Sequence, residues 1–136
     1  MTLERINPES LAAPSGFAHA VRTSDTVRVY LAGQTALDRD GRIIGSNVVE
    51  QFEHALTNLL TALGEAGGAP SDLASLTIYA VDLADYRAHA REIGAAWRRL
   101  VGRDYPAMAA VGVARLWDDD ALVEVQGVAE LSGPAT

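Results

Sequence analysis

The sequence predicts an α+β fold in which two helices pack on one face of a mixed six-stranded sheet. Two segments carry apolar residues three and four positions apart, the spacing that buries one face of a helix. Six other segments are rich in β-branched residues or alternate apolar with polar residues, as strands do. Their order along the chain is β-β-β-α-β-α-β-β, and strand runs interleaved with two helices favour this class of fold.

The clearer helix is expected over residues 47–68. Asn47 and Glu50 predict an N-cap with a capping box, and Gly67 predicts the C-terminal stop. Its apolar stripe consists of Phe52, Leu56, Leu59, Leu60 and Leu63.

The second helix is expected over residues 85–102. Its apolar stripe consists of Tyr86, Ile93, Trp97 and Leu100. The charged residues that fall largely outside this stripe, and therefore predict a solvated face, are Arg87, Arg91, Arg98 and Arg99.

Strands are expected at residues 3–6, 17–22, 26–33, 76–83, 107–116 and 121–131, with a turn at Ser24 and Asp25. Both sets of alternating residues in 76–81 are largely apolar, so the sheet face away from the helices also needs a cover. Self-association would supply it. If residues 107–116 and 121–131 form a hairpin that turns near Trp117, Met108 lies opposite Gln126.

Length and composition predict a single domain over residues 1–136, with a disordered tail at 132–136. With 49% hydrophobic residues and no apolar run of membrane-spanning length, we expect a soluble, cytoplasmic protein with no membrane partner. The formal net charge of −7 argues against nucleic acid as a partner, because such binding depends on Lys and Arg neutralising phosphates.

Several kinds of chemistry are excluded by residue type. The chain has no Lys for a Schiff base and no Cys for a thiolate nucleophile or metal ligand. The acidic run Trp117 to Asp120 is typical of a solvated turn, so no metal and no cofactor is expected. Of the three histidines, His54 and His89 fit ordinary helix positions, whereas His19 shares a strand face with Phe17 and is a candidate for a position near a ligand.

Over Asn7 to Leu131 the chain resembles the Rid family, the reactive intermediate deaminases also called the YjgF family. The resemblance rests on "SGFAHAV", "YLAGQTALDRDGRIIG", "VVEQFEHALTNLLTALGEAGG", "LTIYAVDLADY", "YPAMAAVGVARL" and "VEVQGVAEL". It implies a homotrimer with three ligand clefts at the subunit interfaces. Deaminating members hydrolyse enamines and imines derived from amino acids, with an Arg that holds the substrate carboxylate.

Compared position by position, the polar groups of that family site are replaced here. The resemblance places Met108 at the essential Arg and Gln126 at the carboxylate of the last strand, while Glu124 matches a glutamate that many members have. The other replacements are Phe17 for Tyr, Ala32 for Ser, Ala90 for Asn and Ala110 for Cys. The ligand-binding residues implied by the resemblance are Phe17, Ala32, Gly33, Ala90, Met108, Ala110 and Gln126.

These replacements leave several functions open. The first is a binding protein for a small, neutral, partly apolar metabolite that lacks 2-imino acid deaminase activity. The second is a hydrolase or deaminase of another imine, enamine or labile carbonyl compound, with Gln126, Glu124 and His19 as candidate catalytic residues. A ribonuclease and a protein-binding trimer are the remaining possibilities. In the alternative without any pocket, Met108 and Phe17 fill the subunit interface.

Overall fold

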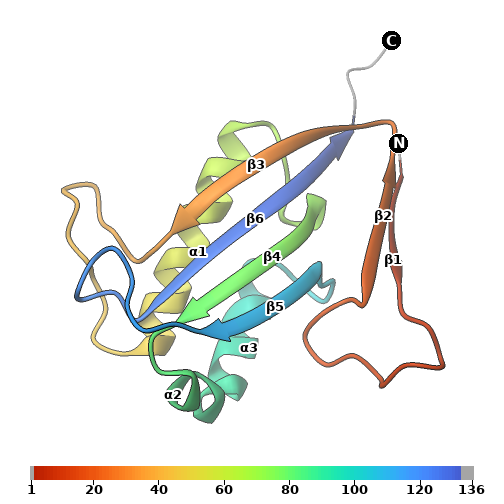
Figure 1. The fold of residues 1–136 in the computed structure, drawn as a ribbon. Helices are drawn as coiled ribbons and strands as arrows, with labels where there is room; N and C mark the ends of the chain where they lie inside the picture. The colour runs from red at the N-terminus through yellow and green to blue at the C-terminus, as the bar shows by residue number, and fades with distance from the viewer. Residues whose placement is uncertain (1, 133–136) are drawn as a thin grey trace.

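The computed structural model describes residues 2–132 and confirms an α+β fold with six strands (Figure 1). The strands are β1 Thr2–Ile6, β2 Ala20–Ser24, β3 Thr26–Gln34, β4 Leu73–Ala80, β5 Ala107–Gly112 and β6 Val123–Ser132. The helices are α1 Val48–Glu65, α2 Leu83–Ala88 and α3 Ala90–Leu100, with a 3-10 turn at Pro70–Asp72. Of the predicted tail, Ser132 ends β6, and residues 133–136 lie outside the described residues.

The main sheet is mixed, as predicted, and has the order β3-β6-β4-β5. β4 runs parallel to β5, whereas the β3–β6 and β4–β6 pairs are antiparallel. The helices lie together behind this sheet in Figure 1, so the opposite face is left uncovered by any helix of the described chain. We call the helix-covered side the helix face and the other side the open face.

The six strands do not form one continuous sheet, because β1 and β2 make a separate antiparallel ribbon. Asp25 has a φ of 54°, which turns the chain sharply between β2 and β3 and interrupts the pairing. The ribbon stands beside β5 in Figure 1, where Ala18 N donates to Pro106 O at 2.9 Å and Arg5 Nε donates to Tyr105 O at 3.1 Å. The first residues of the chain therefore lie beside β5, at the edge of the main sheet opposite β3.

The predicted hairpin between residues 107–116 and 121–131 is wrong, because β4 lies between β5 and β6. The connecting loop crosses the end of β4, where Val113 N donates to Ala80 O and Val81 N donates to Leu122 O. A long connection can pass over a strand that is already in place, and the spacing of two strands in the sequence does not reveal this.

Helix α1 follows its sequence signals closely. The Asn47 side chain accepts a hydrogen bond from Glu50 N at 2.9 Å, as an N-cap does. The Glu50 carboxylate accepts from Ser46 N rather than from Asn47 N, so only half of the predicted capping box forms. At the other end Gly67 has a φ of 90° and Gly68 N donates to Leu63 O, which is the Schellman ending.

The second helical segment is interrupted at His89, so it forms α2 and α3 rather than one helix. His89 has φ −107° and ψ 21°, and its Nδ1 lies 2.9 Å from the carbonyl oxygen of Asp85. The apolar stripe is confirmed, because Ile93 and Trp97 are buried in the core. The predicted solvent face is also present, since its four arginines are exposed.

The core lies between the helices and the helix face of the sheet. Its α1 side includes Phe52 and Leu59, which pack with Leu76 of β4 and Val125 of β6. Gly127 is required for a close approach of β4 and β6, because a Cβ there would lie 2.7 Å from Ser75 O.

Over the described residues, none of the helices combines the length and apolarity that crossing a membrane requires.

Candidate functional site

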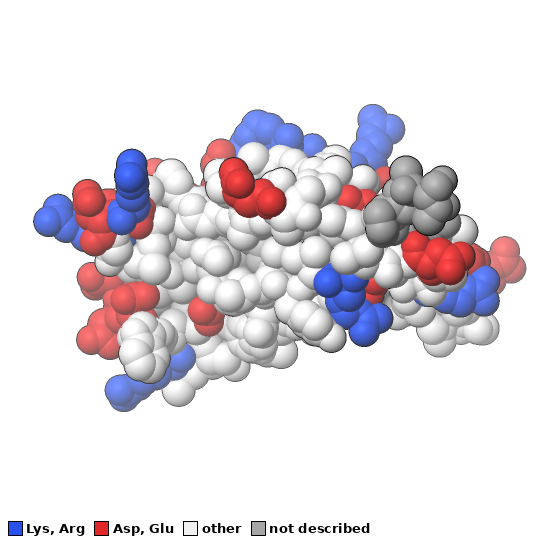
Figure 2. All heavy atoms as spheres, turned by 90° about the horizontal axis from the view of Figure 1, so that it is seen from above, with Lys and Arg blue, Asp and Glu red and all other residues white. Residues whose placement is uncertain are grey.

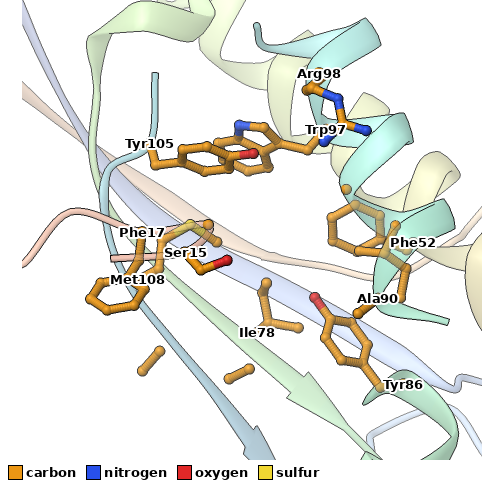
Figure 3. Close-up of a pocket in the computed structure, with 15 residues that line it drawn as sticks. Ser15, Phe17, Phe52, Ile78, Tyr86, Ala90, Trp97, Arg98, Tyr105 and Met108 are labelled. Atoms are coloured by element: carbon orange, nitrogen blue, oxygen red, sulfur yellow. The ribbon is translucent and has the colours of Figure 1, made fainter. Parts of the chain in front are cut away.

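A pocket of about 380 Å³ opens between β4, β5, the two helices α2 and α3, and the loop that precedes β2 (Figure 3). Pockets of this size accommodate small organic ligands. The residues that line it are Ser15, Gly16, Phe17, Phe52, Ile78, Tyr86, Ala90, Ile93, Gly94, Trp97, Arg98, Tyr105, Met108, Ala109 and Ala110.

The pocket walls are mainly apolar and aromatic. Met108 pairs with Leu76 in the β4–β5 register, so its side chain lies on the helix face and borders the pocket next to Phe17. The Trp97 and Tyr105 rings stack at 5.4 Å with an interplanar angle of 12°. Trp97 Nε1 also donates to Asp104 O at 3.3 Å, which helps to hold this wall in place.

Besides the Tyr105 hydroxyl and the Trp97 indole N–H of the stacked wall, three polar side chains border this apolar space: Ser15, Tyr86 and Arg98. Burial raises the pKa of Tyr86 to about 12, and its ring contacts Phe52 edge-on with a centroid distance of 6.2 Å. Arg98 is exposed at the rim. The sequence placed Arg98 on a solvated face, because helical periodicity does not show that one flank of that face borders a pocket.

The predicted ligand-binding residues divide into two groups. Four of them line the pocket: Phe17, Ala90, Met108 and Ala110. The other three do not line it: Ala32, Gly33 and Gln126.

Gln126 belongs to a polar cluster on the open face. It pairs with Thr77 in the β4–β6 register, and its Oε1 accepts from the Tyr79 hydroxyl at 3.0 Å. Glu124 pairs with Tyr79, and a Cβ on Gly33 would lie 2.7 Å from Glu124 Oε1. Ala32 precedes Gly33 where the β3–β6 register shifts. The predicted catalytic candidates Gln126 and Glu124 are therefore together, but on the face opposite to the pocket.

His19 has a local structural role. Its Nε2 lies 2.8 Å from Ala12 O, and its backbone N donates to Asn7 Oδ1 at 2.9 Å. The predicted shared strand face with Phe17 is wrong, because β2 begins only at Ala20 and both residues lie in the loop before it. Their rings nevertheless pack edge-on with a centroid distance of 5.0 Å. His19 thus supports the loop that carries Phe17, and it does not itself line the pocket.

A buried charge lies at the far end of the open face. The Glu130 side chain is 4% exposed and accepts from the Thr26 hydroxyl at 2.6 Å and from Arg28 Nε at 2.5 Å. These bonds, with Thr26 the larger contributor, hold the pKa of Glu130 below its usual value.

In residues 2–132, no three His, Asp or Glu side chains gather in a way that could hold a metal ion.

A helix-covered mixed sheet with an apolar pocket at its β5 edge defines a small α+β domain suited to small organic ligands. The family model described as Endoribonuclease L-PSP matches residues 8–131. The chain belongs to this family, the Rid or YjgF family.

Relatives share the fold over nearly the whole chain. A crystal structure of a Rid family protein of unknown function from Yersinia pestis is 31% identical, has a TM-score of 0.86, and is matched over 96% of this chain and 100% of its own. A RutC family protein of Synechocystis is 34% identical over 96% of this chain and 98% of its own. A 2-iminobutanoate/2-iminopropanoate deaminase of Capra hircus is 29% identical over 92% of this chain and 86% of its own.

Proposed function

We propose that this Rid family chain binds a small, largely apolar metabolite in the Met108 pocket and is not an active 2-imino acid deaminase. The observation that supports this most is Met108 itself. Its side chain borders the pocket at the position where the resemblance implies the carboxylate-binding Arg. A thioether adapts to irregular apolar ligands but cannot pair with a carboxylate, so the part of the ligand next to Met108 is uncharged.

The paired replacement at Gln126 supports a remodelled site rather than a damaged one. Positions 108 and 126 lie on opposite faces of one chain, so an Arg and a carboxylate there could pair only between two copies. In such a cleft, removing only the Arg would leave a charged partner without compensation, which costs several kcal/mol. An uncharged amide at position 126 avoids that cost. It also forms its own hydrogen bond, to the Tyr79 hydroxyl.

As part of the same proposal, the chain forms a homotrimer in the cytoplasm, and a second copy completes each cleft. Gln126, Gly33 and Ala32 lie away from the pocket of their own chain, so a neighbouring chain would have to bring them to it. The open face supports association, because Tyr30 is 76% exposed and Val111 is 39% exposed there.

Equilibrium dialysis tests the binding proposal. The wild-type protein and an Ala110→Phe variant, whose added ring would occupy the pocket, are dialysed against a cellular metabolite extract. Mass spectrometry then compares the compounds that each protein retains. We expect a small apolar compound to be enriched by the wild type and by the exposed-helix control Ala95→Phe, but not by Ala110→Phe. Equal retention by all three proteins would overturn the proposal.

A second candidate is hydrolysis of a different imine, enamine or labile carbonyl compound. The cluster of Glu124, Gln126 and Tyr79 favours it, because an amide and a carboxylate can position water at a reacting carbon. If this activity exists, a Glu124→Gln/Gln126→Ala double variant should lose it. Unchanged turnover of a substrate by that variant would remove these residues from the mechanism.

The Endoribonuclease description of the family model raises a third function, cleavage of RNA. The net charge of −7 opposes it, and Figure 2 shows acidic and basic side chains interspersed rather than a basic patch on the face in view. We expect no RNA retention in a filter-binding assay at low salt. Retention that weakens steeply as salt is added would support RNA binding instead.

A further inference from the structure

We propose that the ligand of the Met108 pocket is a monocarboxylic acid with an aromatic body, and that Arg98 at the rim holds its carboxylate. This inference rests on the proposed binding function and specifies the ligand class. It gives the ligand a negative charge, in contrast to the neutral ligand that Met108 alone predicts from the sequence.

The charge of the lining favours an anion. Arg98 is the one charged side chain among the fifteen lining residues, and no carboxylate lines the pocket to neutralise it. A cationic ligand would meet a like charge at the rim, whereas a carboxylate would receive a charge-assisted hydrogen bond from the guanidinium. The pocket therefore discriminates by the sign of the ligand's charge.

Arg98 is free to make such a bond. Among the ion pairs of residues 2–132 none includes Arg98, whereas the adjacent Arg99 pairs with Glu53. A Cβ at Gly94 would lie 3.4 Å from Arg98 Nη1, so the Arg98 side chain folds back over this glycine, one turn earlier in α3. Gly94 itself lines the pocket, and its lack of a side chain leaves the guanidinium accessible from the pocket side.

The remaining lining suits an aromatic body. Stacked Trp97 and Tyr105 form one wall, and Phe17 and Phe52 add further rings. Tyr86 lies at the other end of the pocket from Arg98 in Figure 3, and its hydroxyl points into the pocket. With its raised pKa, Tyr86 remains a hydrogen-bond donor at neutral pH. The Tyr86 hydroxyl can donate a hydrogen bond to an acceptor atom at the end of the ligand that is remote from the carboxylate.

Matched probes test this inference. We would titrate the protein with phenylacetate, 3-phenylpropanoate and 4-phenylbutanoate, each beside its neutral primary amide, in a Trp117→Phe background. In that background Trp97 is the remaining tryptophan, so its fluorescence reports on the pocket. We expect at least one acid to bind about five- to tenfold more tightly than its amide, and added salt to reduce that preference.

The Arg98→Gln variant should lose the preference for the acid while its affinity for the amide stays within about twofold. The matched control is Arg87→Gln, which removes an exposed arginine of α2 that does not line the pocket. It should keep the preference.

Equal binding of acids and amides by the wild type would overturn the role of Arg98, while leaving the binding function in place. An acid preference that survives in Arg98→Gln would overturn it as well. Absence of binding by all six probes would overturn this ligand class, and the dialysis experiment would then decide separately whether the pocket binds any metabolite.

Discussion

Met108 and Gln126 lie on opposite faces of the main sheet. Met108 of β5 pairs with Leu76 of β4. Gln126 of β6 pairs with Thr77, which follows Leu76 in β4. Successive residues of a strand point to opposite sides, so the two side chains cannot line one cleft within a single chain. If they share a site, as the family resemblance implies, two copies of the chain must form it.

A charge at the centre of the open face should therefore prevent assembly. In a Thr77→Arg variant, three copies would bring three like charges toward one another in a region with little access to water. We expect light scattering after size-exclusion chromatography to give the mass of a trimer for the wild type and of a monomer for the variant. Circular dichroism should show that the variant remains folded. A monomeric wild type would contradict the assembly.

The β4–β6 contact predicts a stability effect at Gly127. Its missing Cβ allows the backbone of β4 to approach, because a Cβ would lie 2.7 Å from Ser75 O. Gly127→Ala should lower the free energy of unfolding by about 1–3 kcal/mol, the usual cost of overpacking. Gly64→Ala is the control, since a Cβ there meets nothing within 4 Å and alanine favours the helix by up to about 1 kcal/mol. Urea denaturation of both variants measures the two free energies of unfolding, and only that of Gly127→Ala should fall below the wild-type value.

The Glu130 carboxyl predicts how stability depends on pH. Its pKa is lowered in the folded chain, so its contribution is present above the unfolded pKa of about 4.3 and is lost as the pH falls through the folded value. The free energy of unfolding of the wild type should therefore drop more between pH 7 and pH 3 than that of Glu130→Gln. The exposed pair of Glu4 and Arg22 supplies the control, because Glu4→Gln should behave like the wild type. Equal losses in all three proteins would rule out a role for Glu130.

Local signals in the sequence predicted much of the fold. The cap at Asn47, the stop at Gly67 and the buried stripe of α1 depend on residues within a few positions of one another, and they are where the sequence placed them. The six strands follow from the same kind of local pattern. The interruption of the second helical segment at His89 could not be predicted, because the apolar residues on either side of it keep an ordinary helical spacing.

Long-range placement could not be read in this way. Nothing in the spacing of residues 107–131 shows that β4 separates β5 from β6, and the hairpin prediction failed for that reason. The sharp turn at Asp25 likewise separates β1 and β2 from the main sheet, although each strand was expected. Arg98 was missed because α3, β5 and the loop before β2 enclose the pocket only after folding.

The central claim is that a pocket with Met108 at this position does not support deamination of 2-imino acids. The most direct test is the rate at which 2-aminoacrylate, generated in situ, loses its imine nitrogen, with the Capra hircus deaminase as the positive control. We expect the wild-type chain to leave that rate at the value measured without protein, while the control accelerates it. Acceleration by this chain comparable to that of the control would contradict the claim.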